Sequence, residues 1–261
     1  MKKTSSQSLP KQPLLSLVIP AYNEEAVIEK TVRAFHDELK KEKIPHEILV
    51  SNDSSKDKTE EILKRLTKEI KEVRYVNNVP PNGFGFNVRN GLENYNGDCV
   101  AVVMADMSDR PVDLVSYYRK MQEGNYDAVF GSRFIKGGKT IDYPRNKIFL
   151  NRFTNNIIRV LFGVKYNDVT NAFKLYKRET IDGVKPFLSH HFNLTVELPL
   201  KAIVRGYTYA VVPNYWTNRA VGESNLKIKE MGSRYFYIIL YCLIEKWLSR
   251  GDYKKKEEAN L

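Results

Sequence analysis

Short apolar runs alternate with longer amphipathic stretches along the first half of the chain. Residues 14–19 predict a buried strand ended by Pro20, and apolar side chains then recur at helical spacing over 28–39. Strands are predicted in the same way at 47–51, 73–76, 99–104 and 127–130, with helices at 62–70, at 87–95 and from Pro111 onward. This β-α alternation predicts an α/β fold with a mostly parallel sheet and helices on both faces.

The pattern loosens after Gly131. Helices are predicted at 146–161 and 194–205, and strands at 173–176 and 207–212. We expect a polar tail over residues 1–13, one α/β domain over 14–226 and a separate segment over 227–261. At the starts of two helices, Asn23 and Asp57 are of the residue types that cap the first turn.

The last segment combines basic and aromatic residues. From Lys227 to Lys256 there are eight lysines and arginines, and an aromatic-rich stretch from Tyr235 to Trp247 lies between them. The apolar part is too short to span a bilayer, but this composition suits a helix lying on an anionic membrane surface. A helix packed on the core, or one joining two copies of the chain in a homo-oligomer, is the alternative.

Charge and composition limit the classes of partner that the chain is expected to bind. The 261 residues carry a formal net charge of +11, and 42% of them are apolar, which is enough for a real core. Such a charge attracts anionic lipid, phosphorylated substrates or nucleic acid, and nothing beyond the charge favours nucleic acid. The two cysteines and four histidines show no metal-ligand spacing. No signal peptide is evident, so we expect a cytoplasmic location.

Chemistry-bearing side chains follow the ends of the predicted strands, where an open α/β sheet binds its ligand. Tyr22 could lie against a nucleobase, and Glu24 could accept a hydrogen bond from it. Asp53 could accept from the N–H of a uracil or a guanine, because a buried base edge needs such a partner. The glycines of Gly83-Phe84-Gly85 would allow close approach of the backbone to an anion at the following helix start, but on its own this spacing favours a plain tight turn.

A carboxylate and several arginines complete the pattern. Asp106 follows the most apolar strand, where a carboxylate can hold Mg²⁺ or Mn²⁺ against two phosphates and so neutralise a departing diphosphate. Arg133, Arg145 and Arg219 lie in or beside predicted loops, and their guanidinium groups suit phosphate oxygens. Together these residues resemble a metal–diphosphate site more than a nucleic-acid groove.

The order of the motifs resembles one enzyme family. The motifs are Ile19-Pro20-Ala21-Tyr22-Asn23-Glu24, Asn52-Asp53-Ser54-Ser55-Lys56-Asp57, Met104-Ala105-Asp106, Gly131-Ser132-Arg133 and Asn218-Arg219-Ala220-Val221-Gly222-Glu223-Ser224. From about Leu15 to Leu226 the chain resembles a family 2 glycosyltransferase of the GT-A fold, and most closely the polyprenol-phosphate hexose synthases such as dolichol-phosphate mannosyltransferase. The resemblance implies metal-dependent, inverting transfer of a hexose from a UDP- or GDP-sugar.

The same resemblance implies roles for single residues. It assigns nucleotide binding to Pro20, Tyr22, Glu24, Asp53 and Arg219, metal binding to Asp106 with Ser108 nearby, and the acceptor side to Arg133, Arg145, Asp168 and Glu197. Asp106, Arg133 and Glu197 are the expected catalytic residues. One departure is Met104, which stands where the family has the first acid of its DxD motif, and a thioether is a poor ligand for a hard cation.

The acceptor decides the mechanism. The oxygen of a polyprenyl (dolichyl or undecaprenyl) phosphate is already anionic near neutral pH, so such an acceptor needs positioning and charge stabilisation but no base. A hydroxyl acceptor on a cell-surface glycan would need a carboxylate base, for which Glu197 and Asp168 are the candidates. Met104 also leaves open a protein that binds a nucleotide sugar without turnover. Many relatives carry spanning helices after the catalytic domain, whereas this chain has a short basic, aromatic segment in that place. We therefore expect a peripheral enzyme at the cytoplasmic face of a membrane.

Overall fold

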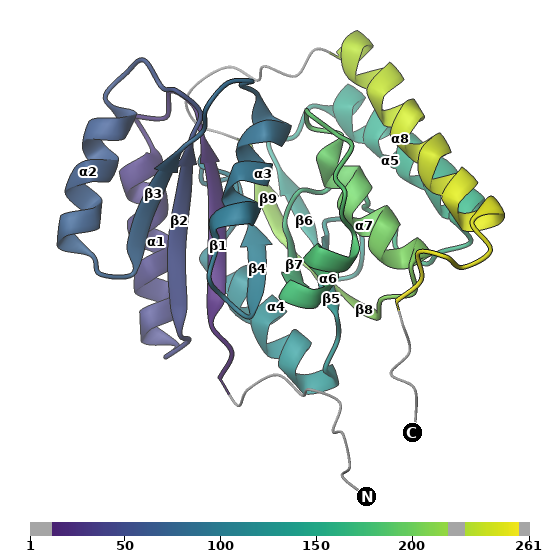
Figure 1. Ribbon diagram of the computed structural model, residues 1–261, viewed down its shortest axis with the longest axis horizontal. Coiled ribbons are helices and arrows are strands. Elements are labelled where there is room, and N and C mark those ends of the chain that lie inside the picture. The colour runs from purple at the N-terminus through teal and green to yellow at the C-terminus, as the bar shows by residue number, and fades with distance from the viewer. Residues whose placement is uncertain (1–11, 219–227, 256–261) are drawn as a thin grey trace, which may run out of the picture.

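The computed structural model describes residues 12–218 and 228–255, with side chains from residue 232 onward in the second range. Its centre is a seven-stranded sheet with the strand order β3-β2-β1-β4-β7-β5-β8 (Figure 1). The strands are β1 (Leu15–Ala21), β2 (His46–Asn52), β3 (Val73–Asn77), β4 (Cys99–Val102), β5 (Ala128–Ser132), β7 (Lys174–Lys177) and β8 (Tyr209–Pro213). All neighbours pair in parallel except β7, which is antiparallel to both β4 and β5.

Helices cover both faces of the sheet, as the alternating pattern predicts. Successive strand residues point to opposite faces, so Leu17 and Ile19 enter one apolar core and Val18 enters the other. The first core is closed by α1 (Ile28–Lys41), α2 (Thr59–Glu69) and α4 (Pro111–Gly124), and the second by α3 (Phe84–Asn94), α5 (Arg145–Phe162), α6 (Arg178–Gly183), α7 (Leu194–Val204) and α8 (Ile228–Leu248).

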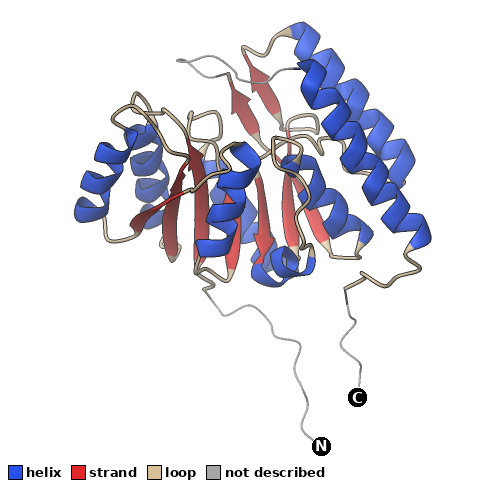
Figure 2. Ribbon diagram, turned by 45° about the horizontal axis from the view of Figure 1, so that its top comes forward, coloured by secondary structure: helices blue, strands red, loops and turns tan. Residues whose placement is uncertain are grey.

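A second, two-stranded sheet stands beyond the edge of the main one. It pairs β6 (Lys139–Ile141) with β9 (Tyr215–Thr217) in parallel, and Figure 2 shows both strands projecting past the ends of the central strands. Neither strand was expected from the sequence, because three residues are too few to show a period of two. Both strands lie beyond the carboxyl edge of the main sheet.

Two predictions about the loop after β1 are wrong. Pro20 lies inside the strand and pairs with Ser51, whereas it was expected to end it. Asn23 does not cap α1, which begins five residues later, but adopts a left-handed φ of 54° and accepts a hydrogen bond from Lys56 N at 2.8 Å. Asp57 does accept from Thr59 N at 2.9 Å at the start of α2.

The C-terminal helix α8 has two different sides. Ile238, Cys242 and Leu243 are buried in the second core, while Phe236 and Trp247 are exposed. Figures 1 and 2 show α8 lying along α5 at one end of the molecule. Among the helices of the described residues, none is both long and apolar enough to cross a bilayer.

Sheet order brings the motif-bearing loops together. Strand β1 lies between β2 and β4, so the loops that follow these three strands meet at one edge of the sheet. The chain turns one way from β1 to β2 and the other way to β4, which is the switch point where open α/β sheets bind ligands. Tyr22, Asp53 and Asp106 therefore share this edge.

At the opposite end of β2, two histidines form a hydrogen-bonded pair. His46 Nδ1 lies 2.8 Å from Ile44 O and can only donate there, so His46 Nε2 must accept from His36 Nδ1, 3.1 Å away. His46 is neutral in this arrangement, and burial lowers its pKa.

We predict that this pair makes the fold less stable in mild acid. The unfolded chain takes up a proton at His46 as the pH falls below about 6.5, before the folded chain does, so the free energy of unfolding falls in that range. Thermal melts between about pH 7.5 and about pH 5 check this. His46→Gln should show a smaller loss of melting temperature over the same range, and an unchanged pH slope would contradict the assignment.

Candidate active site

The loop after β1 presents an aromatic ring and a carboxylate at the switch point. Tyr22 is 46% exposed, and Glu24 is partly buried two residues later. The loop is held by the loop after β2, because Asn23 N donates to Ser55 Oγ at 3.1 Å and Glu24 N to Thr59 Oγ1 at 2.9 Å. The ring of Tyr22 is thus available to a flat ligand such as a nucleobase.

Asp53, at the end of β2, is buried and fixed from three directions. Its Oδ1 accepts from the side-chain amides of Asn78 and Asn82 at 2.7 and 2.8 Å, and its Oδ2 accepts from Gly83 N at 2.8 Å. The carboxylate therefore also ties the loop after β3 to the site. One lone pair of Oδ2 remains for a donor such as the N–H of a base.

The glycines that begin α3 do not form an open anion site. Gly85 N donates to His190 O at 3.1 Å, and a Cβ on Gly85 would lie 2.3 Å from the backbone carbon of His190. Gly83 N is used by Asp53. The glycines let residues 188–192 pack on this helix start, which rules out the alternative of a phosphate bound there.

The loop after β4 holds the candidate metal ligands. Asp106 Oδ1 accepts from Ser108 N at 3.1 Å, and Ser108 O accepts from Thr217 N at 3.1 Å at the end of β9. Ser108 Oγ is buried and has no hydrogen-bond partner among the described residues. Asp109 is also buried, and burial, with the nearby charge of Asp106, raises its pKa to about 7.

These groups fit a sparse site for a hard divalent cation. Mg²⁺ and Mn²⁺ prefer oxygen ligands, which the carboxylate of Asp106 and the unpartnered hydroxyl of Ser108 can supply. In the described part of the chain, no group of three or more His, Cys, Asp or Glu side chains is arranged to hold a metal ion. The remaining ligand positions would therefore have to come from water and substrate phosphates.

Arg133 and Asp168 form a buried ion pair after β5. Arg133 Nε and Nη2 donate to the two carboxylate oxygens of Asp168 at 2.8 and 2.7 Å, and Arg133 N donates to Oδ2 at 2.9 Å. Asp168 is fully buried. The carboxylate expected on the acceptor side thus serves to orient Arg133 and has no surface of its own to offer an acceptor.

Glu197 is also unavailable as a base. It is fully buried in α7, where its Oε1 accepts from Lys201 Nζ at 2.6 Å and from Leu188 N at 2.7 Å. Its Oε2 accepts from Ser189 N at 2.6 Å. We therefore correct the expected catalytic role: Glu197 holds the 188–192 loop in place. The four-residue spacing to Lys201 is the sequence signal for this pairing.

Two aromatic residues that sequence reasoning missed, Trp216 and Tyr143, lie between the loop after β4 and Arg133. Trp216 forms a backbone bridge with Asp109 and packs against Tyr143 with ring centroids 4.7 Å apart. The ring of Tyr143 lies in turn 5.7 Å from the guanidinium of Arg133. Arg145 is exposed at the first turn of α5, and Arg219 lies outside the described residues.

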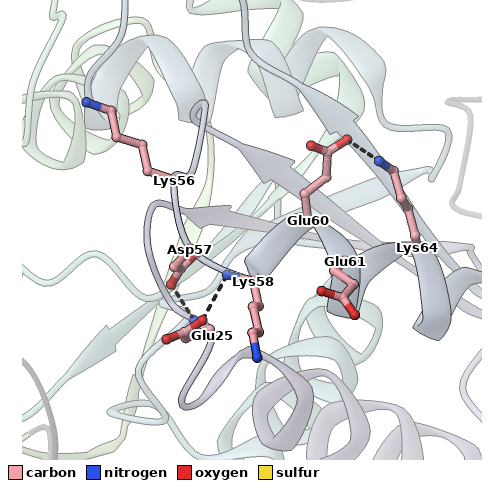
Figure 3. A pocket seen from close by; sticks show the side chains of 7 residues that line it. All are labelled: Glu25, Lys56, Asp57, Lys58, Glu60, Glu61 and Lys64. Carbon is pink, nitrogen blue, oxygen red and sulfur yellow. Dashed lines mark hydrogen bonds and ion pairs between the residues drawn. The ribbon is translucent and has the colours of Figure 1, made fainter.

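A hollow of about 600 Å³ opens beside the loops that follow β1 and β2 (Figure 3). Its lining is entirely polar and charged: Glu25, Lys56, Asp57, Lys58, Glu60, Glu61 and Lys64. Several of these groups bind each other, since Asp57 accepts from Glu25 N, Glu25 accepts from Lys58 N and Glu60 pairs with Lys64. We assign the active site to the sheet edge, where the carboxylates, the ring and the unpartnered hydroxyl converge.

Comparison with known proteins agrees with this geometry. Residues 16–184 match the family described as Glycosyl transferase family 2. Glycosyltransferase AglD of Haloferax volcanii is 27% identical over 226 residues, which is 84% of this chain and 36% of that protein. Dolichol-phosphate mannosyltransferase of Pyrococcus furiosus is 27% identical over 242 residues, which is 91% of this chain and 65% of that protein. The chain thus spans about a third to two thirds of the length of these relatives.

A solved structure shares the fold. Glucosyl-3-phosphoglycerate synthase of Mycobacterium tuberculosis, crystallised with Mn²⁺, UDP and phosphoglyceric acid, superposes with a TM-score of 0.68 at 19% identity, covering 88% of this chain and 78% of that one. The predicted GT-A fold is therefore confirmed. Because the family match covers more than half of its residues, the chain belongs to the family 2 glycosyltransferases.

Proposed function

We propose that this glycosyltransferase moves a hexose from a UDP- or GDP-sugar to the phosphate of a polyprenyl phosphate at a membrane surface. The observation that carries the proposal is the burial of both candidate bases. Asp168 and Glu197 are fully buried and hydrogen-bonded, so neither can take a proton from a hydroxyl acceptor. A phosphate oxygen needs no such base, and Arg133 and Arg145 supply positive charge to hold it.

The donor residues keep their expected roles in this proposal. Pro20, Tyr22, Glu24 and Asp53 bind the nucleoside. Asp106 and Ser108 hold Mg²⁺ or Mn²⁺, which would neutralise charge on the departing diphosphate. Arg219 binds the donor phosphates, which agrees with the contact of Thr217, two residues earlier, to Ser108.

The reaction then needs few protein groups. An oxygen of the acceptor phosphate forms the new bond to the anomeric carbon while the bond from that carbon to the diphosphate breaks, which inverts the configuration. Arg133, held rigid by Asp168, orients the acceptor phosphate. Asp106 would hold the divalent ion, and that ion would supply positive charge to the leaving group. The rate comes from alignment and charge stabilisation.

The exposed faces of α5 and α8 support a membrane-surface acceptor. Large apolar side chains are exposed on both helices: Phe149, Leu150, Phe153, Ile157, Val160, Leu161, Phe236, Tyr237, Leu240, Ile244, Trp247 and Leu248. The two helices lie side by side, and the chain carries a net charge of +11. An exposed apolar face on a chain with a positive net charge suits peripheral binding to an anionic cytoplasmic leaflet.

A second candidate acceptor is a soluble phosphorylated compound. The fold neighbour was crystallised with phosphoglyceric acid, which also carries a phosphate group. The same arginines would bind either phosphate, and the apolar faces of α5 and α8 are what favour the lipid. The Pyrococcus furiosus relative is named for dolichol phosphate, which also supports a lipid acceptor.

We predict that the purified chain releases nucleoside diphosphate from a UDP- or GDP-sugar only when polyprenyl phosphate and Mn²⁺ or Mg²⁺ are present. Asp106→Ala should lower the rate at least about 100-fold, because it removes the main metal ligand. Ser108→Ala should raise the metal concentration needed for half-maximal rate. Asp182→Ala, at an exposed acid on α6, is the matched control and should leave the rate and the metal concentration for half-maximal rate unchanged.

Each acceptor gives a distinct result. Release that requires 3-phosphoglycerate and ignores the lipid would replace the proposed acceptor with the soluble one. Release with an unphosphorylated saccharide alone would refute the argument from the two buried carboxylates. Donor binding without release under every condition would show a protein that binds nucleotide sugars without turnover.

We also predict that Asp168 contributes to stability and positioning, with no role in proton transfer. Asp168→Asn should lower the free energy of unfolding by about 3–5 kcal/mol, because it leaves the buried Arg133 without its counter-ion. Asp182→Asn, in the exposed pair with Lys185, should cost less than about 1 kcal/mol. Urea unfolding measures both. If Asp168→Asn removed the acidic limb of the pH–rate profile at unchanged stability, Asp168 would be a base after all.

A further inference from the structure

Two arginines share the ring of Phe134, and among the residues that the structure describes only Arg133 has a counter-ion. The guanidinium carbons of Arg133 and Arg152 lie 5.3 and 5.5 Å from the centroid of that ring. The charge of Arg133 is matched by Asp168. Arg152 is exposed, and within the described residues it makes no hydrogen bond and no ion pair. A second cation beside the same ring therefore has no anionic partner in the described part of the chain.

The position of Arg152 on α5 places it between the site and the apolar face. Arg145, Arg152 and Arg159 are seven residues apart, so they form one row along the helix, with about 10 Å between neighbours. Helical geometry places this row between the buried side, which includes Ile158 and Phe162, and the exposed apolar residues. Of the three arginines, Arg152 is the one in contact with Phe134.

The residues next to Arg152 form hydrogen bonds with the segments around Tyr143 and Thr170. Asn151, the residue before Arg152, donates to the hydroxyl of Tyr143 at 3.5 Å and contacts Thr170 through its Oδ1 at 3.2 Å. The ring of Tyr143 faces Arg133 and packs on Trp216, which adjoins the Asp106 loop. Arg152 thus directly follows a residue that contacts Tyr143, one of the two aromatic residues between the Asp106 loop and Arg133.

We propose that Arg152 is a specificity-determining residue that binds the acceptor phosphate together with Arg133, on either side of the position set by Phe134. This inference rests on the proposed function and deepens it. A phosphate monoester carries more than one negative charge near neutral pH. The charge of Arg133 is already matched by Asp168, so Arg145 alone is not sufficient to balance the phosphate. Arg152 supplies the missing charge and directs the lipid tail toward the apolar face of α5.

The test separates acceptor binding from membrane binding. A short, water-soluble prenyl phosphate serves as the acceptor without vesicles, and its dissociation constant and KM are measured for the full chain. Arg152→Gln should weaken acceptor binding and raise its KM by about 10- to 100-fold, with KM for the donor sugar unchanged. Arg152→Lys should lie between, because it keeps the charge and loses the planar fork.

Arg159→Gln is the matched control, since Arg159 belongs to the same row and contacts Asn156 at 3.3 Å with no contact to Phe134. It should leave both acceptor constants unchanged. If Arg152→Gln binds the soluble acceptor like the wild type, the inference is wrong. If Arg152→Gln and Arg159→Gln lose binding to anionic vesicles equally while the soluble acceptor binds normally, Arg152 contacts lipid headgroups instead. If the wild type binds no prenyl phosphate, the proposed function itself fails.

Discussion

The buried pair of Arg133 and Asp168 sets the geometry on which the acceptor side depends. Taking two charges out of water costs several kcal/mol per ion, and that cost is recovered only with close, well-aligned hydrogen bonds. Here a bidentate contact and a backbone N–H meet this condition. The pair joins the end of β5 to the segment before β7, so Arg133 cannot move toward a ligand. A ligand must instead come to a fixed cation, which is the condition for catalysis by positioning.

The donor side depends on the order of strands in the sheet. Apolar runs that stop at Tyr22, Asp53 and Asp106 could be found in the sequence, and a parallel sheet necessarily brings such ends to one edge. The antiparallel direction of β7 could not be found, because reversing a short buried strand leaves its apolar pattern unchanged. The burial of Glu197 was hidden for a related reason. An acid inside an apolar helix looks like a site until its partners Lys201, Leu188 N and Ser189 N are known.

In the proposed metal site, Met104 would change which ligands the substrate has to supply. With a thioether in place of a carboxylate, the protein offers fewer charged ligands to a hard cation, so more of the coordination must come from the diphosphate itself. Metal and donor binding would then be strongly coupled, each raising the affinity for the other by the same factor. The unpartnered hydroxyl of Ser108 is consistent with a site completed only when the donor is present.

Charge balance connects the two halves. In the proposed reaction, the diphosphate that leaves and the phosphate that attacks are both anionic, and both must approach the same anomeric carbon despite their repulsion. On the donor side a divalent ion held by Asp106 can offset that charge. On the proposed acceptor side, Asp168 has already neutralised much of the charge of Arg133. Additional arginines on α5 are therefore required to make the acceptor side attractive to a phosphate, and the fold places them where the helix meets its exposed apolar face.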